Sequence, residues 1–427
     1  MKKVTIALLA LLGFIFIVPQ TGNAIPAFAR KYGFNCNMCH TSFIKLNDFG
    51  QRYRDYGYQI PGQEGYEKNV FETAPPLAIR TSFGLSLIKS HSTISGFNIY
   101  GFDFLAAGVL HKNISFLMIY TPRIDEPAAD YRGSAGGSNP SQLAAVESGN
   151  ILFSNLITDA LNLRIGRFEP AYHAVSSKRS YYINQPYEIY TYATPKINYL
   201  FDDNQMGVEA SGHFKNGFHY GLGVVNGTGA SPDNNTYKDI YLDLYQVFGR
   251  GEGQSAGQRI GAFGYLGWQP ASLPDPDSSY PVGAEFNGGD NKSFYRVGGD
   301  LSLNYKTFNL RALFMHGNDN REFKNLDSTL RTLDSTSDYN YSGGFVELDY
   351  AALPNNRLLI SAMYNMVRPP SYDESNRINA FSGLIRYYLG DWTAVNVALH
   401  AEYTHREVGK DQPLKEDIFL LLVDFDF

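Results

Sequence analysis

Segments of about ten residues in which apolar and polar side chains alternate recur along most of the chain. One of them is VNVALHAEYTH, in which Val395, Val397 and Leu399 alternate with Asn396 and His400. In a transmembrane β-barrel this two-residue period turns one face of each strand toward lipid and the other toward a polar lumen. A soluble β-sandwich shows the same alternation, so the connections have to distinguish the two folds.

Short and long connections alternate between the predicted strands, except that the first outer turn, near residues 89–94, is short. Outer-membrane barrels produce this alternation because their periplasmic turns are tight and their extracellular loops are long. We therefore predict an all-β fold, a transmembrane antiparallel β-barrel of about 16 strands over residues 74–427, with both barrel ends on the periplasmic side. The predicted strands start near residues 78, 94, 112, 146, 160, 205, 217, 238, 257, 294, 307, 340, 357, 378, 393 and 417.

The composition agrees with a barrel that faces lipid. The 427 residues include 31 Tyr and 29 Phe, and the mean hydropathy is −0.26. After the N-terminus, no apolar run approaches the roughly 20 residues of a membrane helix. Trp268 and Trp392 fall at ends of predicted strands, where the aromatic belts of such barrels lie. The net charge of −6, without a basic cluster, indicates no nucleic-acid partner.

Residues 1–24 predict a secretory signal peptide. Lys2 and Lys3 precede an apolar run from Val4 to Val18, and small residues precede a cleavage position after Ala24. The apolar run is short and ends in a cleavage pattern, which favours a signal peptide over the alternative of a retained anchor helix. We expect export of the chain and insertion in the bacterial outer membrane.

Both cysteines of the chain lie in one motif, Cys36-Asn37-Met38-Cys39-His40, shortly after the predicted export signal. The C-x-x-C-H spacing is typical of c-type haem attachment, in which two thiols bond the haem and the histidine becomes the proximal iron ligand. We predict that Cys36, Cys39 and His40 bind one covalent haem c, with His40 as the metal ligand. A disulfide is the alternative in an oxidising compartment, and a zinc site would need two further ligands of suitable spacing.

Residues 25–73 form the predicted haem-binding segment. This length is too short for stable folding without a cofactor or a host surface. Asn47 or Asp48 is expected to cap a helix after the motif. Several side chains are candidates for covering a haem face or meeting its propionates, although each is also an ordinary core or surface residue: Phe43, Phe49, Tyr53 and Tyr56 for the face, and Lys31, Lys45, Arg52 and Arg54 for the propionates.

The stretch IPAFARKYGFNCNMCHTSFIKLNDFGQRYRDYGYQIPG, followed by a porin-like barrel, resembles the fused outer-membrane cytochrome–porins, a family that includes monohaem cytochromes of iron-oxidising bacteria. The likeness is most specific in residues 26–61, where Cys36, Cys39 and His40 match the family motif. It implies one haem c that passes electrons across the outer membrane, from an extracellular donor such as Fe(II) to a periplasmic cytochrome or other carrier. The chain would then act as an electron-transfer cytochrome and Fe(II) oxidase.

The resemblance supplies no second axial ligand for the haem iron, and the sequence leaves that ligand open. Met118 and Met206 are expected on lipid-facing positions, His213, His219 and His400 on lumen-facing positions, and His91, His173 and His405 in or near outer loops. Acidic residues of the outer loops are candidates for attracting Fe(II), with ordinary solvated charge as the alternative: Asp125, Glu126, Asp130, Asp319, Asp373 and Glu374.

The linker between the haem segment and the first strand, roughly residues 63–74, is short. We therefore expect the haem segment to enter the lumen as a plug. No catalytic side chain is predicted, since the cofactor performs the chemistry. Two alternatives stay open beside inward electron transfer: a passive porin or anion channel with a structural haem plug, and electron export to extracellular acceptors.

Overall fold

A computed structural model describes residues 27–34, 38–42, 44–72, 77–122, 145–158, 160–173, 175–184, 187–197, 199–271, 291–323, 337–353, 356–392 and 395–426. The predicted signal peptide and Cys36 lie outside the described residues. Among those residues, no helix is long and apolar enough to cross a membrane.

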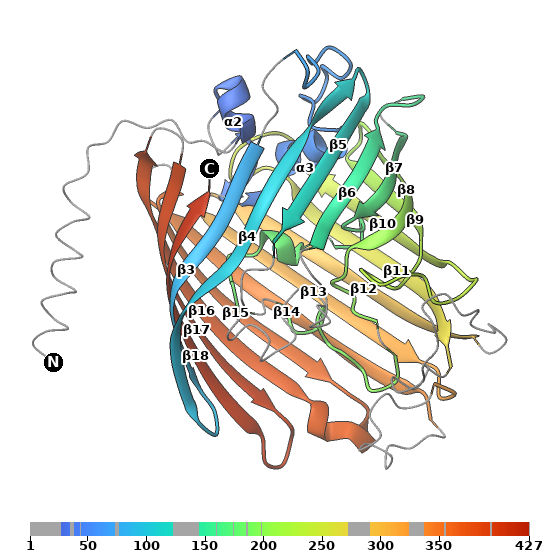
Figure 1. The fold of residues 1–427 in the computed structure, drawn as a ribbon, viewed down its shortest axis with the longest axis vertical. Helices are drawn as coiled ribbons and strands as arrows, with labels where there is room; N and C mark the ends of the chain where they lie inside the picture. The colour runs from blue at the N-terminus through green and yellow to red at the C-terminus, as the bar shows by residue number, and fades with distance from the viewer. Residues whose placement is uncertain are drawn as a thin grey trace, which may run out of the picture.

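The described strands β3 to β18 close into one antiparallel barrel of sixteen strands, each paired with its sequence neighbours and β18 paired with β3 (Figure 1). The predicted fold class and strand number are confirmed, and every strand starts within about three residues of its predicted position. The strands are Leu77–Lys89, Thr93–His111, Ile114–Thr121, Ala145–Phe153, Asn162–Phe168, Gln205–His213, Phe218–Val225, Asp239–Phe248, Gln258–Pro270, Asn291–Tyr305, Phe308–Asp319, Tyr339–Ala352, Leu358–Arg368, Ile378–Trp392, Val395–Val408 and Leu414–Asp426.

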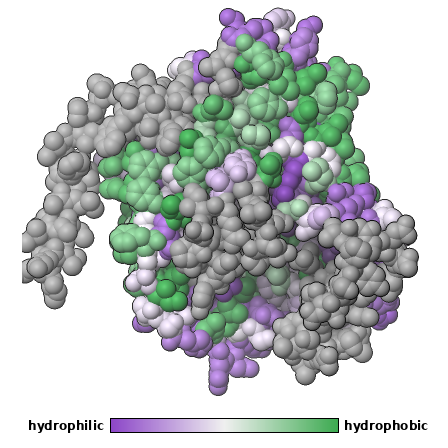
Figure 2. All heavy atoms as spheres, viewed as in Figure 1, coloured by the Kyte–Doolittle hydropathy of each residue, from purple (hydrophilic) through white to green (hydrophobic). Residues whose placement is uncertain are grey.

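Alternation along the strands gives the barrel an apolar outer surface. In β18, Phe419 and Leu421 are exposed, whereas their neighbours Leu420 and Leu422 are buried inside. Met118 and Met206 are exposed on the outer face, as predicted. Figure 2 shows hydrophobic residues gathered over the strands in view, with hydrophilic residues at the top and bottom. A closed barrel with such a surface satisfies its backbone hydrogen bonds within lipid, which places it in the bacterial outer membrane.

The connection between β17 and β18 differs from the prediction of a longer loop over residues 405–417. The strands extend to Val408 and resume at Leu414, because charged residues pair across them. Glu407 lies opposite Lys415, and the Lys415 Nζ lies 2.9 Å from the Glu407 carboxylate. Charge in this region therefore belongs to a strand pair and not to a loop.

A β-bulge at Gly101 reverses which side of β4 faces the lumen. The pairing with β3 shifts between Thr81 and Ser82, and Gly101 has a φ of 69° that suits glycine. Before the bulge, Phe97 is exposed on the outer face, and after it Phe104 is exposed instead. The bulge thereby turns the odd-numbered residues from 103 to 109 toward the lumen.

The N-terminal segment, residues 27–72, contains α2 (Ala27–Tyr32), β1 (His40–Ser42), β2 (Lys45–Leu46) and α3 (Asp48–Asp55). It lies at the barrel end that carries the short connections, where the chain's C-terminus also lies (Figure 1). The Asn47 side chain donates to the Gly253 carbonyl at 3.4 Å, and Gln59 donates to the Ser154 hydroxyl at 3.3 Å. Both partners belong to short connections between strands.

The inner segment, residues 169–204, connects β7 to β8 and runs inside the barrel (green in Figure 1). It includes the short helix η3 (Ser177–Arg179). Its buried aromatic residues pack with inward-facing side chains of β9 to β16 in the main hydrophobic cluster, as in the stack of Tyr187 on Phe345 with centroids 4.0 Å apart. The inner segment meets the N-terminal segment, since the Ser42 and Tyr181 hydroxyls form a hydrogen bond.

Candidate functional site

The second half of the C-x-x-C-H motif is held against α3. Asn47 caps the helix by accepting from the Gly50 N–H at 2.9 Å, which confirms the predicted cap. The Asn47 N–H donates to the Cys39 carbonyl at 2.9 Å, and its side-chain amide donates to the Met38 carbonyl at 3.0 Å. A Cβ at position 50 would lie 2.1 Å from the Cys39 carbonyl oxygen, so the contact requires glycine. The cap and the glycine together fix where Cys39 and His40 lie.

Cys39 and His40 line a cavity of about 330 Å³ between the N-terminal segment and the barrel wall. The wall is formed by β3 to β7, and much of it is apolar, which is unusual for the inside of an outer-membrane barrel. The bulge at Gly101 contributes to this surface, because it turns Leu105 and Ala107 inward. The apolar wall residues of the cavity are Ala78, Ile79, Leu105, Ala107, Phe116, Leu117, Ile119, Leu152 and Phe168.

Aromatic side chains of the N-terminal segment form the opposite side of the cavity. Phe28 stacks on Tyr58 with ring centroids 5.2 Å apart and meets Tyr53 edge-on at 5.3 Å. Tyr32 stacks on Phe34 at 5.2 Å. Of the predicted aromatic candidates only Tyr53 lines the cavity among the described residues, since Phe49 and Tyr56 are buried elsewhere and Phe43 lies outside them. The sequence did not predict the other four cavity rings, because their spacing does not indicate a shared surface. These rings are Phe28, Tyr32, Phe34 and Tyr58.

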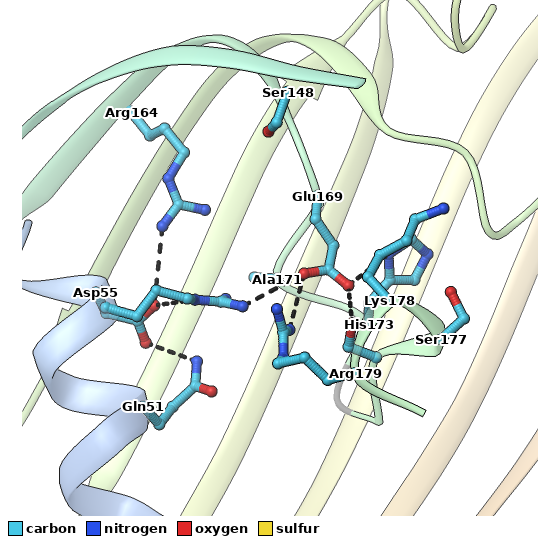
Figure 3. A network of polar contacts seen from close by, with 12 residues as sticks. Gln51, Asp55, Ser148, Arg164, Glu169, Ala171, His173, Ser177, Lys178 and Arg179 are labelled. Atoms are coloured by element: carbon cyan, nitrogen blue, oxygen red, sulfur yellow. Dashed lines mark hydrogen bonds and ion pairs between the residues drawn. The ribbon is translucent and has the colours of Figure 1, made fainter. Parts of the chain in front are cut away.

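Basic side chains bring positive charge to the cavity. The Arg80 guanidinium is 40% exposed, donates to the Lys178 carbonyl at 3.0 Å and pairs with Asp103. The Arg179 Nη2 donates to Glu169 at 2.8 Å, in the network shown in Figure 3. Each of these cations contacts an acid on one side and the cavity on the other, so a carboxylate of a bound ligand would find donors here.

All four predicted propionate partners contact acidic side chains, Arg54 among them through Asp55 and Glu169. Lys45 is buried against Glu347 and Asp349, Lys31 pairs with Glu67, and Arg52 pairs with Asp48. Only Arg54 lines the cavity. Sequence reasoning missed Arg80, Lys178 and Arg179 because they lie in β3 and the inner segment, far from the motif in sequence.

The residues present fit a covalent haem. An apolar cavity flanked by aromatic rings suits a porphyrin, and the cations suit its propionates. Burial lowers the pKa of His40 to about 4, so its imidazole stays neutral at neutral pH, which is the form that binds iron. Cys39 and His40 lie on the cavity wall, whereas Cys36 is outside the described residues.

The candidates for a second axial ligand lie away from this cavity. Among its described lining residues, His40 is the only histidine and there is no methionine. His213, His219 and His400 are buried on the lumen side of their strands, as predicted. His173 was predicted in or near an outer loop, but it is buried in the inner segment, where its ring packs against Tyr190 and Phe201. His91 and His405 lie in the first outer turn and toward the outer end of β17.

The acidic residues that were predicted to attract Fe(II) do not form a common surface among the described residues. Asp125, Glu126 and Asp130 lie outside the described residues. Asp319 is buried and pairs with Arg296 at 2.7 Å, and Asp373 is buried and accepts from Tyr339. Of the described candidates only Glu374 keeps partial exposure, and it lies 3.4 Å from Lys410.

Comparisons with known proteins support the barrel. The chain is similar to a high-pH structure of Pseudomonas putida OprB, with a TM-score of 0.53, 13% identity, and 84% of this chain and 95% of that chain covered. It is also similar to an anion-selective porin from Comamonas acidovorans (TM-score 0.50, 10% identity, 83% and 99% covered) and to a trimer form of Vibrio cholerae OmpT (TM-score 0.50, 10% identity, 83% and 98% covered).

No protein-family model and no curated protein matches the chain. At these identities the solved structures show the fold alone. The porin part of the predicted resemblance is thus supported, and its cytochrome part rests on the motif and on the cavity.

Proposed function

We propose that this outer-membrane barrel carries one haem c, attached at Cys36 and Cys39 with His40 as iron ligand, and that it transfers electrons between an extracellular donor such as Fe(II) and a periplasmic carrier. The observation that carries the proposal is the apolar cavity at Cys39 and His40. On the side of β9 to β16 the apolar side chains of the lumen are covered by the inner segment, whereas the apolar wall of β3 to β7 lines a cavity, and such a surface favours a largely apolar ligand. A haem bound there supplies one-electron transfer.

The chain's own residues have defined tasks in this proposal. α3 holds the motif through Asn47 and Gly50. The aromatic rings and the apolar wall would shield a bound haem from water, and such burial is one of the factors that set a haem's redox potential. Arg80, Lys178 and Arg179 offer donors for propionates. The cytochrome–porin resemblance supports Fe(II) and a periplasmic cytochrome as the two partners.

The contact of the N-terminal and inner segments also supports electron transfer over solute passage. The Ser42 and Tyr181 hydroxyls form a hydrogen bond, and the Arg54 guanidinium lies 3.3 Å from the Glu169 carboxylate. Both contacts join the N-terminal segment to the inner segment. The segments are therefore suited to act as a plug, which leaves little room for a water-filled channel.

Covalent haem in the purified protein tests the proposal. The full chain is expressed with a c-type haem maturation system, purified in detergent, and assayed by haem stain on a denaturing gel and by its pyridine haemochrome spectrum. We expect one haem per chain, none in Cys36→Ala/Cys39→Ala, and an unchanged content in the matched control Met38→Leu. Addition of Fe(II) to the oxidised protein should reduce it. Wild-type protein without covalent haem would overturn the proposal.

A passive porin is the second candidate function, and the likeness to porins, one of them described as anion-selective, favours it. Single-channel recording in planar bilayers separates the two. Electron transfer through a filled lumen predicts conductance far below that of an open porin, in both the haem-loaded protein and the double-cysteine variant. Stable, porin-sized conductance of the haem-loaded protein would support the channel instead.

A further inference from the structure

A second group of ligand-type side chains lies where α3 meets the barrel wall. Asp55 is the last residue of α3, His213 is the last residue of β8, and His219 is the second residue of β9. The register of the hairpin places His213 directly opposite His219, and their ring centroids are 4.1 Å apart. None of the three lines the cavity at Cys39 and His40.

The donor atoms of these residues are close enough to share one ion. His213 Nε2 lies 3.0 Å from Asp55 Oδ2, and His219 Nε2 lies 4.0 Å from the same oxygen. All three donor atoms lie within 4.8 Å of one another. Tetrahedral metal–ligand bonds of about 2.0–2.2 Å place donor atoms about 3.3–3.6 Å apart, so the Asp55–His213 pair, hydrogen-bonded at 3.0 Å, has to open only slightly to share an ion. A side-chain shift below about 1 Å would bring in His219.

His219 provides an independent sign of a missing ligand. Its side chain is only 3% exposed, and neither ring nitrogen has a hydrogen-bond partner. Buried polar groups in folded proteins are nearly always hydrogen-bonded, so an orphaned buried imidazole calls for a bound species. His219 stacks on Tyr245 with centroids 4.2 Å apart, which holds the ring toward Asp55 and His213.

The surroundings support Asp55 as a ligand. Gln51 donates to Asp55 Oδ2 at 2.9 Å, and Arg54 donates to Oδ1 at 3.2 Å. Such outer hydrogen bonds orient metal-binding carboxylates. Figure 3 shows Gln51 and Arg164 on either side of the Asp55 carboxylate. The positive charge of Arg164 is offset by Glu209, whose carboxylate lies 3.2 Å from it.

We propose that Asp55, His213 and His219 bind one divalent transition-metal ion of the Fe²⁺ to Zn²⁺ series. Two imidazoles and one carboxylate are a ligand set for such ions, and they leave positions open for water. The ion fastens α3 to the hairpin of β8 and β9, and so holds the N-terminal segment in the barrel. This site does not depend on the haem, because it shares no residue with the cavity.

Metal binding to the full chain, purified without a histidine tag and stripped with a chelator, tests the site. Zn²⁺ is titrated by calorimetry, and Co²⁺ by its visible absorption, which reports the ligand geometry. We expect one equivalent per chain, and at least about 100-fold weaker binding in His219→Ala and in the isosteric Asp55→Asn. The matched control is His316→Ala, which removes a barrel histidine that bonds to Ser342 outside the site.

A readout on wild-type protein alone covers the case in which a variant fails to form the barrel. Zn²⁺ should slow proteolysis of the N-terminal segment relative to chelator, because the ion fastens α3. The double-cysteine variant, which cannot attach haem, should bind Zn²⁺ as tightly as wild type. Absence of Zn²⁺ and Co²⁺ binding by wild type would overturn the proposal, as would equal affinity of His219→Ala and His316→Ala.

Discussion

The two sides of the lumen are built differently. On the side of β9 to β16, the inner segment packs its aromatic rings against the wall, and buried or partly buried arginine–aspartate pairs join strands of the barrel. These pairs are Arg259–Asp300, Arg296–Asp319 and Arg311–Asp349, each at 2.7 Å, with Arg386–Asp424 at 2.8 Å farther along the sheet. On the side of β3 to β7, the wall is largely apolar and encloses a cavity beside Cys39 and His40.

The difference indicates which side is structural and which is prepared for a ligand. A charged wall is stable only when every charge is paired, and the chain supplies those partners from its own strands and segments. An apolar wall has no such requirement, but it is left without a packing partner where the cavity lies. The packed side therefore holds the two segments in place, and the hollow side is the candidate cofactor site.

Lys45→Met is expected to have the largest effect, because it removes a cation from the packed side. The Lys45 ammonium lies 2.5 Å from Glu347 and 3.1 Å from Asp349, all of them buried. Glu347 then has no cation, whereas Asp349 keeps Arg311 at 2.7 Å, and one buried carboxylate left unpaired should weaken docking of the N-terminal segment by about 3–5 kcal/mol. Limited proteolysis measures this as faster cleavage within the segment. Lys45→Met/Glu347→Gln should recover part of the loss, and no recovery would contradict the pairing.

Glu169→Gln tests the contact between the inner segment and the N-terminal segment. Docking of the N-terminal segment should weaken by about 2 kcal/mol, which is less than for a fully buried ion pair because Arg179 is partly exposed. Although burial alone would raise the pKa of the Glu169 carboxyl, the guanidinium groups of Arg179 and Arg54 hold it well below the ordinary range. Its stabilisation is therefore complete above the unfolded pKa of about 4.3 and is lost as the pH falls toward the lower, folded pKa.

Proteolysis of the N-terminal segment at a series of pH values, with an acid-stable protease, checks this prediction. Wild-type docking should be constant from about pH 7 to pH 5 and weaken below about pH 4.5. The Glu169→Gln variant should be weaker at neutral pH and show a smaller decline in acid. An equal decline in both proteins would assign the acid sensitivity to other carboxyl groups.

Ala107→Trp fills the hollow side. Ala107 faces the lumen on the cavity wall, so the larger ring should compete with haem and lower the haem content about tenfold. The matched control is Ala106→Trp, one position along β4, where the residue pairs with the exposed Met118 on the outer face. Heat-dependent gel mobility monitors barrel formation. Equal haem content in the two variants would show that the cavity is not the haem site.

Arg80→Gln should give the smallest effect. Loss of one cation beside a haem propionate should change the free-energy difference between the oxidised and the reduced haem by about 1 kcal/mol, which equals about 40 mV for a one-electron couple. The midpoint potential should fall, because the oxidised, more positive iron is then less disfavoured. Lys410→Gln, on the exposed outer surface, serves as the control in a redox titration. An unchanged midpoint potential in Arg80→Gln would show that Arg80 does not lie beside the haem propionates.

Much of the fold was predictable because strand alternation and loop length are local properties. The sixteen strands, the outward Met118 and Met206 and the cap at Asn47 all follow from patterns within a few residues. The bulge at Gly101 was not predicted, because a single glycine in a strand gives no direction of shift. The connection of β17 and β18 was misjudged because cross-strand charge pairs look like loop charge in sequence.

The sequence by itself determined the barrel and its strand number and predicted haem attachment at the C-x-x-C-H motif, since each follows from periodicity or from spacing. Only the tertiary structure decided where the cavity lies, which cations reach it, and that Asp55 meets His213 and His219. These contacts join residues far apart in the chain, since Asp55 and His213 are separated by 158 positions and Arg80 and Lys178 by 98. These residues meet because the barrel closes around two inserted segments, and no local sequence pattern predicts how those segments pack.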